Sequence, residues 1–142
     1  MHDNFNFIHA HVIPALIHKA YRAKIDGSSF EVLGNPNAMR QFLFIDDFTQ
    51  ILKWSLSCWD YRNKEFMAIN PMEYSIREVA ETIADVIGIP RDRITFDEKR
   101  AVGQFRKPAK TDVPSDFNFT SLREGIECTV KWFVKNYETC RK

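Results

Sequence analysis

Residues 75–96 read SIREVAETIADVIGIPRDRITF and contain the signals of a complete helix followed by a strand. Ser75 and Glu78 have the spacing of a capping box, in which each side chain bonds the backbone N–H of the other. The residues that follow are apolar at helical spacing, at positions 76, 79, 80, 83, 86 and 87. Gly88 ends this helix, and 93–96 then reads as a short strand. The segment therefore predicts an amphipathic helix within a mixed α/β fold.

The rest of the chain repeats this alternation of helices and short strands. Three more helices are predicted, from Pro14 to Asp26, over 48–59, and after a second capping box at 121–124. Three more strands are predicted over 30–33, 41–45 and 65–69. The pair Asp46-Asp47 precedes the second helix, where carboxylates cap free N–H groups. We expect one small α/β domain over 1–142 that leans on another surface, because these strands do not suffice for a full doubly wound sheet.

Composition bounds the class of protein. The chain has 142 residues, 44% hydrophobic and 27% charged, with a net charge of +1, so it can bury a core but lacks the field that attracts nucleic acids. No apolar run approaches the ~20 residues of a membrane span, and the polar N-terminus does not resemble a signal peptide. Three cysteines, none in CxxC spacing, favour reduced thiols in a cytoplasmic protein.

The common catalytic motifs are absent from the sequence. No two of the five glycines are closer than seven residues, which excludes a GxGxxG dinucleotide loop and a phosphate loop. None of the four tyrosines is followed four residues later by lysine, and neither GxSxG nor HExxH occurs. If the chain takes part in catalysis, we expect it to supply only part of a site.

Several histidines and basic residues remain candidates for chemistry. His9-x-His11 has two metal-ligand side chains but no third ligand at suitable spacing, so a metal site is the weaker interpretation. His11 suits general acid–base chemistry because imidazole titrates near neutral pH; a structural or surface role is the alternative. Five basic residues could converge on phosphate oxygens, or they could be separate solvated charges: Lys19, Arg22, Arg40, Arg106 and Lys107.

Several motifs together resemble one enzyme family. They are HDNF at 2–5, HVIPAL at 11–16, RQF-x-x-x-DD at 40–47, SIRE at 75–78 and GQFRK at 103–107. With these motifs in this order, the chain resembles the C-terminal, substrate-binding part of the GDP-L-fucose synthases. That family belongs to the extended short-chain dehydrogenases. That family converts GDP-4-keto-6-deoxymannose to GDP-L-fucose with NADPH. The resemblance implies that the Rossmann half is absent here, that this chain itself binds no cofactor, and that its ligand is a GDP-sugar.

The same resemblance implies roles for particular residues. His11 matches the catalytic histidine that protonates the sugar carbon during epimerisation, and Lys19, Arg40 and Lys107 match basic substrate-binding residues. Leu33 stands where the family has a substrate-binding tryptophan, so stacking on the ligand should be weaker. Val102 likewise replaces an acidic residue that bonds the nucleotide.

Two functions are compatible with these residues. The chain could be part of an enzyme that binds a GDP-sugar and completes its site with a Rossmann domain on another chain. It could instead be a non-catalytic binding or interaction module, or a truncated remnant of the enzyme. In both cases we expect the isolated chain to be inactive, and an exposed apolar surface to promote self-association or binding of a Rossmann domain.

Overall fold

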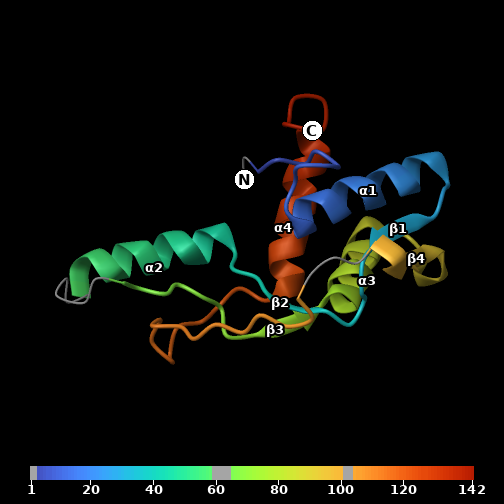
Figure 1. The fold of residues 1–142 in the computed structure, drawn as a ribbon. Helices are drawn as coiled ribbons and strands as arrows, with labels where there is room; N and C mark the ends of the chain where they lie inside the picture. Colours follow the sequence, from blue (N-terminus) through green and yellow to red (C-terminus); the bar gives the residue numbers. More distant parts are fainter. Residues whose placement is uncertain (1–2, 59–64, 101–103) are drawn as a thin grey trace.

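The computed structural model describes residues 3–58, 65–100 and 104–142 (Figure 1). Four α-helices and four strands follow in the order α1 (Val12–Asp26), β1 (Phe30–Leu33), β2 (Met39–Gln41), α2 (Ile45–Cys58), β3 (Glu73–Ser75), α3 (Ile76–Ile87), β4 (Ile94–Asp97) and α4 (Leu122–Lys135). Two short 3₁₀ turns, η1 (Arg91–Arg93) and η2 (Glu98–Arg100), flank β4. The predicted mixed α/β composition is confirmed. No helix in the described part of the chain is long and apolar enough to cross a membrane.

The strands form two small sheets. β1 pairs with β4 in parallel, with Phe30 opposite Ile94, and β2 pairs with β3 antiparallel, with Met39 opposite Ser75. Met39 also forms a parallel bridge to Arg106, which brings the segment after 103 alongside β2. Within the described residues each sheet has two strands, so most of the core must come from helices.

The core lies where α1, α3 and α4 meet. α3 packs between α1 and α4, and α1 also packs on β1. Both predicted capping boxes are confirmed: the Ser75 and Ser121 hydroxyls accept from the N–H of Glu78 and Glu124, whose carboxylates accept from the serine N–H groups in return. The fully buried side chains at this junction are Phe5, Ile17, Ala20, Phe30, Val32, Val79, Ala80, Ile83, Ala84, Ile126 and Phe133.

Two of the predicted strands are wrong. The strand expected over 41–45 ends at Gln41, because the backbone turns into α2: the N–H of Phe48 already donates to the carbonyl of Phe44. Residues 65–69 form no strand, and Met67 bonds through its backbone to Asp112 in the irregular segment before α4. An apolar run predicts burial, but a strand also needs a neighbouring strand as its partner.

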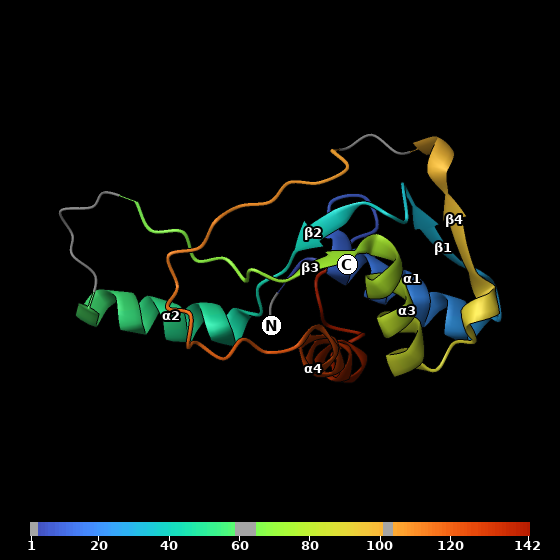
Figure 2. The same cartoon turned by 90° about the horizontal axis from the view of Figure 1, so that it is seen from below.

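α2 lies apart from the three-helix core of α1, α3 and α4, which we call the body. Figures 1 and 2 show that α2 extends away from the body and that the first turn of α2 is the part nearest to the body. Asp46 and Asp47 lie within that first turn rather than at the predicted capping position before it. Asp47 is buried, and its two carboxylate oxygens accept bonds from the N–H and hydroxyl of Thr120, at 2.9 and 2.7 Å. This contact ties the start of α2 to the start of α4.

Candidate functional site

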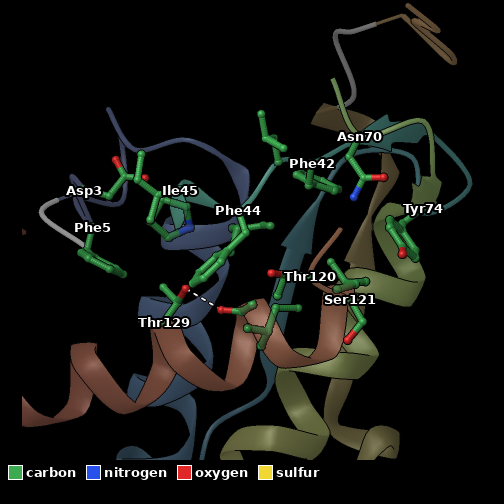
Figure 3. Close-up of a pocket in the computed structure, with 16 residues that line it drawn as sticks. Asp3, Phe5, Phe42, Phe44, Ile45, Asn70, Tyr74, Thr120, Ser121 and Thr129 are labelled. Atoms are coloured by element: carbon green, nitrogen blue, oxygen red, sulfur yellow. Dashed lines mark hydrogen bonds between the residues drawn. The ribbon is translucent and has the colours of Figure 1, made fainter. Parts of the chain in front are cut away.

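Two cavities of nearly equal volume lie on different parts of the molecule. The first, about 520 Å³, lies between the start of α2 and α4, and we call it the aromatic cavity after Phe5, Phe42 and Phe44 (Figure 3). The second, about 510 Å³, lies between α1, β1 and β2, and we call it the basic cavity after Lys19 and Arg40. The two cavities differ in the charge of the residues that line them.

The aromatic cavity suits an apolar occupant. Asp3 is the one charged residue among the described residues that line it. The hydroxyls of Thr120, Ser121 and Thr129 are engaged within the chain, the last donating to the carbonyl of Gly125 at 2.7 Å. A side chain at Gly125 would place its Cβ 3.3 Å from the ring of Phe44, so this glycine lets the ring lie close over α4. This lining offers no cation to a phosphate.

The basic cavity gathers residues that are far apart in the sequence. α1 contributes one face, with Val12, Ala15, Leu16 and Lys19 at helical spacing. β1 contributes Leu33, β2 contributes Arg40, and the irregular segment contributes Gln104 and Phe105. Three of the four predicted substrate-binding residues, Lys19, Leu33 and Arg40, therefore line one cavity.

Arg40 builds a wall of this cavity through its guanidinium group. One terminal nitrogen donates to the carbonyl of Met39 at 2.7 Å, and the other donates to the carbonyl of Gln104 at 2.7 Å. A longer bond, 3.4 Å, reaches the carbonyl of Phe105, which also accepts from the N–H of Met39. Arg40 thus places a positive charge in the cavity and holds residues 104–105 against β2.

Lys19 supplies the second positive charge. Its ammonium group donates to the carbonyl of Glu31 at 3.5 Å, so it lies between α1 and β1. No aspartate or glutamate is among the described residues that line this cavity. Two cations without a lining carboxylate favour an anionic ligand such as a diphosphate.

Two predicted site residues are not among the residues that line the basic cavity. His11 is the exposed N-cap residue of α1, next to the lining residue Val12. Lys107 is exposed, two residues beyond Phe105. Arg106, between Phe105 and Lys107, pairs with Glu73 on β3. Its hydrogen-bonded guanidinium lowers the pKa of the Glu73 carboxyl. Val102 and His2 lie outside the described residues.

The described residues bring no third metal ligand to the histidines at 9 and 11. Among the described residues, no group of three or more histidine, cysteine, aspartate or glutamate side chains could hold a metal ion. The described structure therefore gives the metal interpretation of His9-x-His11 no support.

Sequence reasoning overlooked Phe105 as a site residue. It belongs to the GQFRK motif, but only the basic residues of that motif were candidates. Its signal was a large aromatic side chain in a polar, proline-bearing segment, where nothing in the sequence offers it a core. In the structure its side chain is 59% exposed and lines the basic cavity.

Known proteins resemble this chain over nearly its whole length. No family model matches it. The GDP-L-fucose synthase of Dictyostelium discoideum is 33% identical over 147 residues, covering 99% of the chain and 45% of the relative. The crystal structure of a GDP-L-fucose synthetase from Naegleria fowleri bound to NADP superposes with a TM-score of 0.90 at 36% identity, covering 99% of the chain and 45% of that protein. The chain is a partial homologue of GDP-L-fucose synthase.

Two other matches are the GDP-L-fucose synthase of Escherichia coli K12 and a more distant dehydratase. The enzyme of Escherichia coli K12 is 30% identical, and the chain covers 47% of it. The dTDP-glucose 4,6-dehydratase of Bacillus anthracis, at 18% identity and a TM-score of 0.68, shares the fold alone. The chain spans less than half the length of the GDP-L-fucose synthases that it matches.

The residues of this chain do not fit an NADP site of the usual kind. Such sites place the pyrophosphate on a glycine-rich turn between a strand and the start of a helix. Gly34 directly follows β1, but the next glycine in the sequence is Gly88, and the two-residue spacing of that turn occurs nowhere. These residues therefore cannot build such a glycine-rich turn, whereas the Naegleria protein is a related chain crystallised with NADP.

Proposed function

We propose that this chain is the GDP-sugar-binding, C-terminal part of a GDP-L-fucose synthase-like enzyme and that the basic cavity is its nucleotide site. The observation that carries the proposal is the meeting of Lys19 and Arg40, from separate elements, in one cavity whose described lining residues include no carboxylate. Homology to proteins named GDP-L-fucose synthase supports a GDP-sugar as the ligand class.

The proposed roles follow from the element that carries each residue. Lys19 and Arg40 bind the diphosphate through charge-assisted hydrogen bonds. Lys107 reaches the nucleotide from the segment that Arg40 holds against β2, and Leu33 provides an aliphatic contact. His11 lies at the start of the α1 face that lines the cavity, where its imidazole donates a proton to the sugar.

A second part of the proposal concerns a surface for a cofactor-binding domain. The side chains of Ile45, Phe48, Leu52 and Leu56 are 42–63% exposed and lie three or four residues apart, so they form one apolar stripe on α2. Ile45 also lines the aromatic cavity, so the stripe and that cavity are continuous. We expect a cofactor-binding domain to cover this surface. The matched relatives are long enough to contain such a domain outside the part that this chain matches.

Nucleotide titration tests the first part. Calorimetry of the chain with GDP should give a dissociation constant on the order of 0.1–1 mM, or about 4–5.5 kcal/mol. Arg40→Ala should abolish binding, and Lys19→Ala should weaken it without removing the bonds that hold 104–105. His11→Ala should leave binding intact, and Lys53→Ala on α2 is the matched charge control. Wild-type affinity in Arg40→Ala would contradict the proposal.

Turnover tests the second part and separates it from a binding module. With NADPH and GDP-4-keto-6-deoxymannose the isolated chain should show no reduction, because it lacks a dinucleotide loop. Adding the separately produced cofactor-binding half of a relative should restore turnover, and Leu52→Glu with Leu56→Glu should prevent it. Nucleotide binding without restored turnover would favour the non-catalytic module, which Leu33 in place of an aromatic residue also favours. Turnover by the chain alone would contradict both.

A further inference from the structure

We infer that Phe105 is the residue on which the base of a bound nucleotide stacks in the basic cavity. This inference rests on the proposed function and adds to it the part of the site that distinguishes a nucleotide from a bare diphosphate.

The exposure of Phe105 is the first observation. At 59% it is the most exposed phenylalanine in the described part of the chain, although it lines a cavity. An aromatic face left open to a hollow is an energetic cost unless a ligand covers it. Leu33, 41% exposed, lines the same cavity, so it adds apolar surface but no ring.

The backbone of Phe105 is held in place although its ring is exposed. Its carbonyl accepts from the N–H of Met39 at 2.8 Å and from the guanidinium of Arg40 at 3.4 Å. The carbonyl of Gln104 accepts from the same guanidinium at 2.7 Å. A platform fixed before binding loses less conformational entropy when the ligand arrives.

The same bonds hold the backbone of Phe105 next to a positive charge, and both residues line the cavity. Arg40, the proposed diphosphate ligand, bonds directly to the backbone of the residue that carries the ring. A cation adjoining an exposed aromatic face matches a nucleoside diphosphate, whose phosphates and base require these two surfaces.

Phe7 is the other phenylalanine that lines the cavity, and it is less suited to this role. Its ring stacks on the imidazole of His18, with centroids 4.0 Å apart and planes 14° apart. One of its faces is therefore already covered by the protein.

Paired titrations of the full chain with GDP and with inorganic pyrophosphate test the inference. Phe105→Ala should weaken GDP binding about tenfold, within the range of one base stacked on one ring, and leave pyrophosphate binding unchanged. Phe105→Trp should retain or improve GDP binding. Met72→Ala, which removes a large exposed apolar side chain that lines neither cavity, is the control and should change neither affinity.

The outcomes separate this inference from the proposed function. If wild type binds GDP and Phe105→Ala binds it equally well, the stacking role is overturned and the nucleotide site stands. If Phe105→Ala loses GDP and pyrophosphate equally, the ring only supports the wall of the cavity, and the inference is likewise overturned. If wild type binds neither ligand, the proposed function fails and this inference fails with it.

Discussion

α3 and α2 are helices of similar length and amphipathic pattern with opposite surroundings. α3, 12 residues long, buries its apolar side chains between α1 and α4, and Val79 and Ile83 are fully buried. α2, 14 residues long, leaves Phe48, Leu52 and Leu56 exposed. An apolar stripe thus predicts that a helix face will be covered, but it does not say by what. The body supplies that cover for α3, whereas for most of α2 the described chain does not.

The largest effect is expected where the body is most tightly packed. Ile83→Ala would leave a cavity inside α3's interface and should lower the free energy of unfolding by about 2–5 kcal/mol. Leu52→Ala on α2 removes a side chain of the same size from an exposed site. This change should alter the free energy of unfolding by less than about 0.5 kcal/mol. Urea denaturation measures both. Equal losses would mean that α2 is covered in solution, for example by a second copy of the chain.

A smaller effect is expected at the buried polar contact that Asp47 makes at the start of α2. Asp47→Ala removes the acceptor of two hydrogen bonds from Thr120, a change that should lower the free energy of unfolding by about 1.5–3 kcal/mol. Asp46→Ala, at the exposed neighbouring position of the same turn, is the matched control and should have little effect. Hydrogen exchange should locate the change: amides of α2 should exchange faster in Asp47→Ala, and those of α3 should not. Unchanged exchange in α2 would show that its attachment lies elsewhere.

The sequence predicted features that depend on neighbouring residues. The capping boxes at Ser75 and Ser121 need only a serine and a glutamate three residues apart, and both form as predicted. The strand predicted over 41–45 failed because pairing depends on distant β3, which offers only three residues to β2. Asp47 was predicted as a helix cap from its neighbours alone, because the sequence does not reveal that its partner is Thr120, 73 residues away.

The residues of the candidate site likewise divide into those predicted from the sequence and those found only in the structure. The resemblance to fucose synthases identified Lys19, Leu33 and Arg40, which the fold then brings to one cavity. Phe105 was overlooked because its importance comes from the exposure of its ring and from its bonds to Met39 and Arg40, neither of which the sequence contains.

The smallest effect is a pH dependence that should arise in the body alone. His18 on α1 is buried, and its Nδ1 donates to the carbonyl of Phe5 at 2.7 Å, which ties the N-terminal segment to α1. Burial lowers the pKa of His18 below 6.5; the bond to Phe5 opposes this shift, and the nearby charges of Lys142 and Arg22 add to it.

In the unfolded chain His18 takes up a proton as the pH falls through 6.5, whereas in the folded chain it resists protonation until the pH is lower. The unfolded state then binds more protons, so the free energy of unfolding should be level above pH 7 with respect to His18 and should decrease as the pH falls below 6.5. His18→Gln should remove this slope, and His9→Gln, at an exposed position, should keep it. Denaturation at a series of pH values from about 5 to 8 measures the slope. If the slope persists in His18→Gln, another group is responsible; if α2 opens in the same pH range, the body and α2 are coupled more closely than their packing indicates.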